Sequence, residues 1–144
     1  MLLDNGTVLM YYKAMVDGVR TMALARAPQW NASFEFVGNT GVVGEDPFVW
    51  VQNGTYHMIF HTCCDVKIMS MAWSEDGLKW HVTPGAGHNV NPYPAFSKTI
   101  ELQGGGNVTL SRRERHFLVI DPVTGIPTHL MNGAEPSNDD EIRD

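Results

Sequence analysis

The stretch GEDPFVWVQNGTYHMIFH, residues 44–61, decides the fold. Residues 48–51 form an apolar run of strand-favouring side chains, QNGT supplies an Asn-Gly turn, and residues 56–61 alternate apolar or aromatic side chains with histidine. The pattern predicts a β-hairpin. Period two gives its second strand two faces, and we expect one to carry most of the packing and the other to be available for chemistry. The faces are Tyr56, Met58 and Phe60 on one side and His57, Ile59 and His61 on the other.

A related unit precedes this hairpin. NGTVLMYYKA from Asn5 aligns with NGTYHMIFHT from Asn53 at an offset of 48 residues, and Trp30 then aligns with Trp80 at an offset of 50. A period close to 50 residues is typical of one four-stranded propeller blade, and neither unit has the 3.6-residue periodicity of helices. We therefore expect an all-β chain built of successive antiparallel four-stranded sheets.

Further signals extend the repeat. SEDGLKW, residues 74–80, is a tight Asp-Gly turn that ends in tryptophan, and it resembles a shortened Asp-box. A third unit is predicted as a strand over 114–120, a turn at DPVTG and a return strand over 128–131, while the Gly- and Pro-rich segment 82–96 is predicted to be loop. Residues 1–133 would thus hold about two and a half to three blades.

The first unit lacks a strand that the second has. In the second unit a strand from Glu45 to Gln52 precedes the Asn-Gly turn, whereas the first unit has only MLLD, residues 1–4, in that place. We therefore expect the chain to be a fragment that begins inside the innermost strand of a blade and lacks the earlier, N-terminal blades. An open partial ring exposes strand edges and apolar faces, so the isolated chain is expected to be poorly soluble or oligomeric.

Composition limits the classes of function. The 144 residues are 43% hydrophobic and 18% charged, which suits one globular domain. Residues 134–144 contribute −4 of the formal charge of −6, and we expect them to form a disordered acidic tail. No basic cluster favours nucleic acid, and no apolar run has membrane-spanning length. Four glycosylation sequons, at Asn5, Asn31, Asn53 and Asn107, would suit a secreted parent protein.

Cysteine gives little information. Cys63 and Cys64 are adjacent, so a disulfide between them would be strained. A metal cluster beginning at His61 in HTCCD is conceivable, but the sequence has no second ligand pair with zinc spacing. We expect two buried thiols on a strand, and neither a metal site nor a cofactor.

The segments EDPFVWVQNGTYHMIFH, MAWSEDGLKW and RRERHFLVIDPVTGIPTHLMNG, in this order, resemble the five-bladed propeller glycoside hydrolases of the arabinanase, levansucrase and invertase group, particularly family-43-like members. The resemblance covers residues 1 to about 133. It implies a carbohydrate substrate, a central funnel lined by the first strand of each blade, and three catalytic carboxylates. Asp46 matches the aspartate that tunes the acid, Glu114 matches the acid, and the base would lie before Met1. An axial ion such as calcium occurs in some members.

The residues fit this chemistry in part. Glycosidic cleavage needs carboxyls that converge from separate segments, and a propeller axis brings such segments together. Asp46 precedes Pro47, which disfavours helical geometry, so Asp46 is predicted to be extended with Glu45 facing the opposite way. The alternative interpretation is a polar turn before a strand.

Glu114 lies among arginines. Nearby cations lower a carboxyl pKa, whereas a general acid needs a raised one. Alternation predicts that Arg113 and Arg115 point away from Glu114, while Arg112 shares its face and is a candidate substrate ligand. The alternative is a surface strand with ion pairs. Many relatives carry proline where this chain has His116.

Five other side chains are considered for contact with sugar, although core packing is the commoner role. His57 and His61 could hydrogen-bond sugar hydroxyls, with His129 a weaker candidate. Trp50 and Trp73 could supply flat platforms, but core packing is the favoured interpretation for each. Two other classes of function stay open, namely a non-catalytic sugar-binding propeller and a protein-interaction propeller whose axis gathers no carboxylates.

Overall fold

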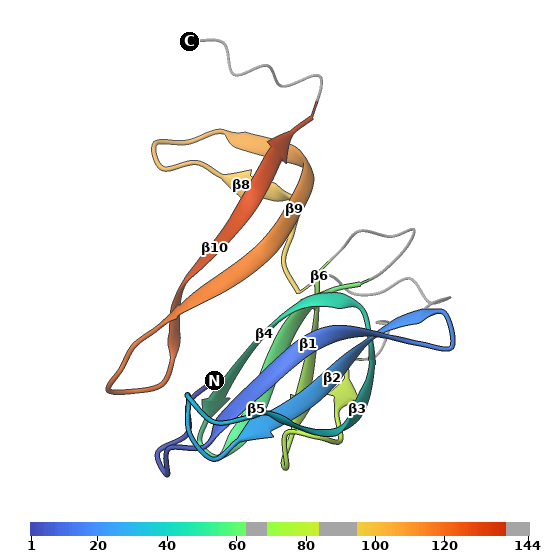
Figure 1. The fold of residues 1–144 in the computed structure, drawn as a ribbon. Helices are drawn as coiled ribbons and strands as arrows, with labels where there is room; N and C mark the ends of the chain where they lie inside the picture. Colours follow the sequence, from blue (N-terminus) through green and yellow to red (C-terminus); the bar gives the residue numbers. More distant parts are fainter. Residues whose placement is uncertain (63–68, 84–94, 138–144) are drawn as a thin grey trace.

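The computed structural model describes residues 1–62, 69–83 and 95–137, and within these ranges the chain contains strands and no helix. The strands of the described residues form three antiparallel sheets (Figure 1). The first sheet holds β1 (Val8–Val16), β2 (Val19–Ala27) and β3 (Glu35–Val43); the second holds β4 (Glu45–Gln52), β5 (Thr55–His61), β6 (Met69–Ser74) and β7 (His81–Val82); the third holds β8 (Thr99–Glu101), β9 (Asn107–Ile120) and β10 (Pro127–Pro136).

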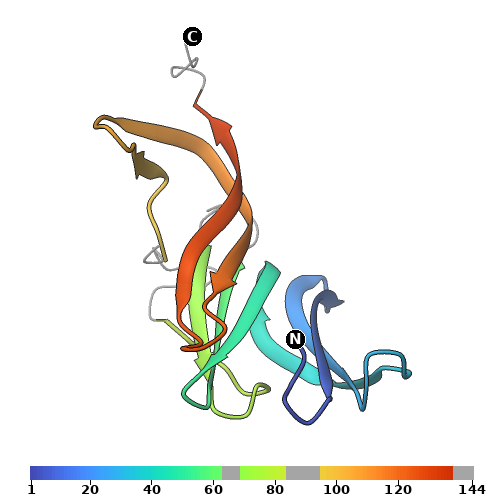
Figure 2. The same ribbon diagram turned by 90° about the vertical axis from the view of Figure 1, so that its left-hand side faces the viewer.

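The second sheet lies between the other two. Figure 2 shows the blue β1–β3 sheet on one side of the green β4–β6 strands and the orange and red β9–β10 hairpin on the other. Strand β4 contacts both β1 and β9. The rings of Phe48 on β4 and Phe117 on β9 meet edge to face at 5.1 Å, so these two strands lie side by side although they belong to different sheets.

The predicted hairpin is confirmed. Strands β4 and β5 pair from Gln52 opposite Thr55 onward, and the two residues between them, Asn53 and Gly54, have φ of 51° and 78°. Two positive φ angles in a two-residue loop are the requirement of a type I′ turn, whose twist matches that of the flanking strands. The Asn-Gly pair meets this requirement with little strain.

The period of two in β5 is confirmed, but the prediction of one free face is wrong. Met58 and Phe60 lie in a core cluster with Met22 of the first sheet. Ile59 lies in a second cluster with Leu118 of the third sheet. Both faces of β5 are therefore packed, because a neighbouring sheet covers each side of the second sheet.

The internal repeat of the sequence is visible in the order of strands, but the three sheets do not have the same number of strands. The sheet order β1-β2-β3 corresponds to β5-β6-β7, and only the second sheet has the four strands that were predicted for every unit. In front of β1 there is one isolated bridge, between Leu2 and Val8. The third unit also differs, since β9 starts at residue 107 rather than 114 and its first residues pair with β8.

The side chain of Asp76 closes the predicted SEDGLKW turn. The Asp76 carboxylate accepts main-chain hydrogen bonds from Leu78 and Lys79, each 2.8 Å long. These bonds lower the pKa of Asp76. The Gly77 carbonyl accepts bonds from the Trp80 ring, 3.0 Å long, and from the Tyr11 hydroxyl, 2.8 Å long. The turn therefore ties β6 of the second sheet to β1 of the first.

The end of the chain follows the prediction in part. The DPVTG turn is confirmed, because the Asp121 carboxylate accepts main-chain bonds from Val123 and Thr124. The boundary predicted after residue 133 is wrong, since β10 continues to Pro136 by pairing with β9. The acidic residues 138–144, and residues 84–94 of the predicted loop, lie outside the described part of the chain.

Candidate functional site

The candidate site lies where the start of β4 faces the middle of β9. Asp46 is at the second position of β4, in an irregularity of the β4–β5 pairing between Glu45 and Phe48. Its φ is 54°, so the prediction of an extended residue is wrong. The reason is a β-bulge, which needs one residue in an unusual conformation, and aspartate tolerates the left-handed region better than most residues. Left-handed geometry in a non-glycine residue is enriched at functional sites.

Glu45 contacts the first sheet, and Asp46 lies near His116 of the third sheet. The Glu45 carboxylate lies 3.2 Å from Lys13 Nζ and 3.4 Å from Arg20 Nη1, both of the first sheet. Burial raises the pKa of Glu45, but the hydrogen bond from Lys13 and the charges of Lys13 and Arg20 outweigh it, so the net pKa is lowered. Asp46 instead acts electrostatically on His116 of the third sheet. Glu45 is thus an ion-pairing residue between the first and second sheets.

His116 is a buried residue of the site that the sequence did not identify. It is 6% exposed, and its Nε2 lies 2.8 Å from the main-chain oxygen of Ile59. Burial lowers its pKa, against the opposing effects of the Ile59 carbonyl and the Asp46 charge. A signal was present in RERHFLVI, because alternation places position 116 on the face of the core residue Leu118.

A second bulge lies in β9 beside Glu114. The pairing of β9 with β10 shifts between Met131 and Gly133, and Arg115 has φ of 53°. Strands β4 and β9 therefore share an arrangement in which a left-handed residue interrupts the strand close to a candidate carboxylate. Bulges redirect side chains and are over-represented next to active sites.

Arg112 and Arg113, on either side of the predicted alternation, have different partners. Arg112 Nε lies 3.4 Å from Glu114 Oε1 and 3.5 Å from Glu135 Oε2, so Arg112 and Glu114 share a face. Arg113 points elsewhere, since it donates to the Ser97 carbonyl and the Asn132 side chain and its guanidinium lies 4.4 Å over the Phe96 ring. Glu114 is partly accessible, with 24% of its side chain exposed.

The predicted sugar contacts on the hairpin lie mostly inside the protein. Trp50 is 7% exposed in the core cluster of Ile59 and Leu118, which confirms its core role. His57 stacks on Trp50 at 5.1 Å, and burial lowers the pKa of His57. His61 is 4% exposed, with Nδ1 3.5 Å from Glu45 Oε1.

The remaining aromatic candidates are at the surface. Trp73 is 42% exposed and stacks on His81 at 4.3 Å, so its favoured core role is wrong. Met71, on the same face of β6, packs against the cluster of Trp50, Ile59 and Leu118, and this cluster does not include Trp73. His129 is exposed and lies 3.0 Å from the Thr128 hydroxyl.

The described residues contain no group of three or more His, Cys, Asp or Glu side chains arranged to hold a metal ion. Cys63, Cys64 and the rest of the predicted cysteine strand lie outside the described residues. No helix in the described ranges is long and apolar enough to cross a lipid bilayer.

Comparisons of the chain with known proteins give no match to a family model, to a curated protein or to a solved structure.

Proposed function

We propose that this chain is part of a five-bladed propeller glycoside hydrolase that cleaves O-glycosidic bonds in an oligo- or polysaccharide. The observation that carries the proposal is the pair of neighbouring strands β4 and β9, each interrupted by a bulge beside a candidate carboxylate. In a propeller, the first strands of successive blades border one funnel, and carboxylates on two of them converge on the substrate.

The proposed roles follow from the surroundings of each carboxylate. Glu114 is partly exposed and donates a proton to the leaving oxygen, and Asp46, which acts on the third sheet through His116, orients and tunes the acid. A carboxylate from another blade is the base. The carboxyls of Asp46 and Glu114 are predicted to lie on the order of 6 to 10 Å apart, which admits a sugar or a water molecule.

Arg112 is the main obstacle to an acid role for Glu114, because its charge favours the ionised carboxylate. It lies almost equally far from Glu114 and Glu135, at 3.4 and 3.5 Å. A small movement toward Glu135, or onto a sugar hydroxyl, would release Glu114 for protonation. In this mechanism Arg112 binds substrate and regulates the protonation of the acid.

A binding experiment tests the proposal on the chain itself, which is expected to hydrolyse no glycoside alone. Arabino-, fructo- and xylo-oligosaccharides are titrated against the protein by NMR or calorimetry. We expect saturable binding of at least one class, weakened by Asp46→Asn and by Glu114→Gln. Glu135→Gln, on the exposed end of β10, is the matched control and should change binding less.

The outcomes separate the classes of function. Binding that is insensitive to both carboxylates contradicts the assigned roles and favours a non-catalytic sugar-binding propeller. No binding of any oligosaccharide by folded protein contradicts a carbohydrate function and favours a protein-interaction propeller.

A further inference from the structure

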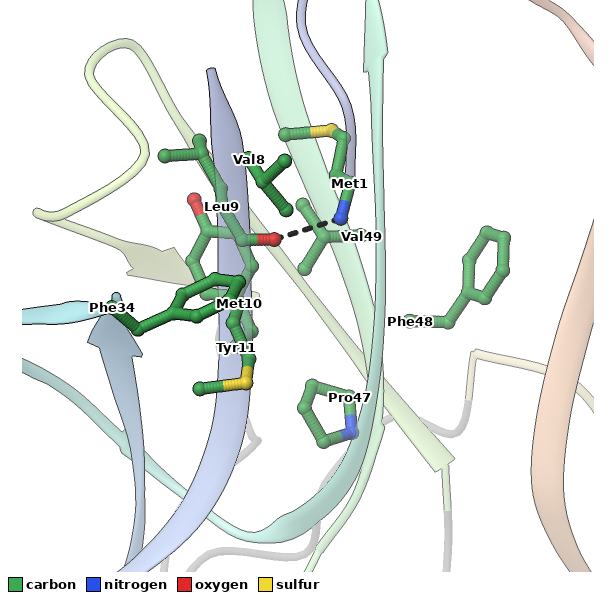
Figure 3. Close-up of a pocket in the computed structure, with 9 residues that line it drawn as sticks. All are labelled: Met1, Val8, Leu9, Met10, Tyr11, Phe34, Pro47, Phe48 and Val49. Carbon is green, nitrogen blue, oxygen red and sulfur yellow. Dashed lines mark hydrogen bonds between the residues drawn. The ribbon is translucent and has the colours of Figure 1, made fainter. Parts of the chain in front are cut away.

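A hollow of about 380 Å³ lies between the first and second sheets, and we call it the sheet-junction pocket. It is lined by five apolar side chains and five polar ones, which are Leu3, Leu9, Leu24, Val37 and Leu78, and Asn5, Thr7, Arg26, Tyr56 and Asp76. Small-molecule sites of roughly 300 to 1,000 Å³ combine an apolar lining with a few polar groups in the same way. The larger hollow between β1 and β4 in Figure 3, of about 560 Å³, has no charged side chain in its lining.

The two walls of the sheet-junction pocket are joined by contacts from one turn. The Gly77 carbonyl, in the turn after β6, accepts a hydrogen bond of 2.8 Å from the Tyr11 hydroxyl of β1. The Leu78 side chain reaches β3, because its Cδ1 would lie 3.4 Å from a Cβ added to Gly38. The second sheet is thus tied to two strands of the first beside the pocket, and a ligand would enter a site whose walls are already in place.

Arg26 brings a positive charge to the face of the first sheet that packs on the second. It lies opposite Leu9 in the β1–β2 pairing, and directly opposite residues place their side chains on one face of a sheet. At the offset of 48 the corresponding pair in the second sheet is His57 opposite Trp73, so the repeat does not require a charge here. The ion pairs of the described residues do not include Arg26. Its guanidinium, a planar fork of N–H donors, is therefore available to a ligand.

Asp76 brings a negative charge to the opposite wall. Its Oδ1 accepts three hydrogen bonds of 2.8 to 3.1 Å, from the main chain of Leu78 and Lys79 and from the Ser74 hydroxyl. The bond from Lys79 is the largest cause of the lowered pKa of Asp76, so the carboxylate is ionised at neutral pH. Because these bonds all end on Oδ1, the second oxygen of Asp76 has no hydrogen-bond partner among the described residues.

The two charges line the same pocket but form no ion pair with each other. A small zwitterion complements this arrangement, because its carboxylate matches the guanidinium fork of Arg26 and its ammonium donates to Asp76. A neutral sugar has neither charge, and a sugar acid has no cation for Asp76. The leucine side chains of the lining favour an apolar substituent on the ligand.

We propose that the sheet-junction pocket binds a free α-amino acid with an apolar side chain, with the carboxylate on Arg26 and the ammonium on Asp76. The apolar side chain packs against Leu24 and Leu78. None of the residues assigned to the carbohydrate function lines this pocket, so the proposal does not depend on that function.

L-Leucine is the probe, titrated into the full chain and followed by NMR or calorimetry. We expect saturable binding. Leucinamide lacks the carboxylate and N-acetylleucine lacks the ammonium, so each should bind about tenfold more weakly or worse, because each loses one charge-assisted interaction. Glucuronate, which has a carboxylate and hydroxyls but no ammonium, tests a sugar acid as the ligand and should also bind more weakly than leucine.

Two substitutions assign the charges. Arg26→Gln and Asp76→Asn should each weaken leucine binding by about tenfold or more, and the asparagine keeps an acceptor oxygen for the turn. In the Asp76→Asn variant the preference for leucine over N-acetylleucine should disappear, and in the Arg26→Gln variant the preference over leucinamide should disappear. Glu75→Gln is the matched control, because Glu75 is exposed beside Asp76 but does not line the pocket, and it should leave binding unchanged. Circular dichroism checks that each variant is folded.

Three results would overturn the proposal. The first is the absence of saturable leucine binding by folded wild-type protein. The second is binding of N-acetylleucine or glucuronate as tight as that of leucine, because Arg26 is then a simple anion site. The third is leucine binding that both Arg26→Gln and Asp76→Asn leave unchanged, because the amino acid then binds elsewhere.

Discussion

The Nε2 atom of His116 on β9 lies 2.8 Å from the main-chain oxygen of Ile59 on β5. This contact joins the third sheet to the second inside the protein, where both residues are buried. A buried main-chain oxygen needs a donor, and the neutral imidazole supplies one when Nε2 carries the proton. The imidazolium donates from Nε2 as well, so protonation of His116 keeps this contact and acts on the docked β9–β10 hairpin through the cost of burying a charge.

The first prediction concerns pH. Burial lowers the pKa of His116 below the ordinary value of 6.5, so the unfolded chain binds more protons than the folded chain when the pH falls below about 6.5. The contribution of neutral His116 to the free energy of unfolding is then complete above that pH, and it is lost as the pH falls toward the pKa of His116 in the folded protein. Urea unfolding at pH 7.5 and at pH 5.5, roughly one unit on either side of that value, should show a lower free energy of unfolding at the acid pH.

The control is His116→Gln, whose amide can donate to Ile59 but does not titrate. Other charged and titratable groups near His116 also contribute to the pH dependence of stability. Asp46 raises and His61 lowers the pKa of His116, and the lowered pKa of His57 contributes in the same direction. The glutamine variant should therefore lose part of the pH dependence. An unchanged dependence would show that His116 is not the group that titrates.

The second prediction concerns the turn after β6. Gly77 has φ of 75°, and a Cβ at this position would lie 2.7 Å from the Tyr11 hydroxyl. Gly77→Ala combines left-handed strain of roughly 1–2 kcal/mol with displacement of the Tyr11 contact. We expect a loss of about 2–3 kcal/mol in the free energy of unfolding by urea denaturation.

Gly18→Ala is the matched control for this prediction. Gly18 has a similar φ of 77°, and a Cβ added there would meet no atom within 4 Å, so the substitution introduces the strain alone. The difference between the two variants measures the contacts of the turn with Tyr11 of β1 and with the Tyr56 ring of β5, which a Cβ would approach to 3.2 Å. Equal losses would mean that these contacts contribute little to the stability of the folded chain.

The third prediction compares neighbouring residues of β9. Leu118 is 8% exposed and packs on Trp50 and Ile59, whereas Val119 is 41% exposed. Leu118→Ala should cost about 2–4 kcal/mol in unfolding free energy, and Val119→Ala less than about 1 kcal/mol. Similar costs for the two substitutions would contradict the packing of the third sheet on the second.

Local sequence signals predicted the elements of the second sheet well. The Asn-Gly pair fixes a type I′ turn through its own backbone preferences, and period two assigns Met58 and Ile59 to opposite faces of β5. The Ser74–Trp80 turn is also local, since the Asp76 carboxylate bonds to the main chain two and three residues later.

Features that depend on distant segments were not predictable in the same way. Coverage of both faces of β5 depends on β2 and β9, which a pattern within β5 does not contain. The left-handed Asp46 arises from a bulge, which is a property of the pairing with β5. At the candidate site, the sequence placed Arg112 beside Glu114 but missed His116, whose burial requires the second sheet.

The last prediction concerns the proposed acid in a polypeptide that carries the complete ring of blades. Glu114→Gln preserves the size of the side chain, and an amide can still accept from Arg112, so folding should be retained. Turnover of substrates with poor leaving groups should fall by roughly 10² to 10⁴ fold, the contribution of a positioned general acid. Substrates with a strongly acidic leaving group need little protonation and should be affected much less.

The comparison of leaving groups decides the role of Glu114, because a general structural defect lowers turnover of both kinds of substrate. Glu135→Gln, at the other partner of Arg112, is the control and should leave both rates nearly unchanged. Equal losses on both kinds of substrate in the Glu114→Gln variant would exclude the acid role. No loss on either kind would support the alternative interpretation, in which Arg112 and Glu114 form one of the ion pairs of a surface strand.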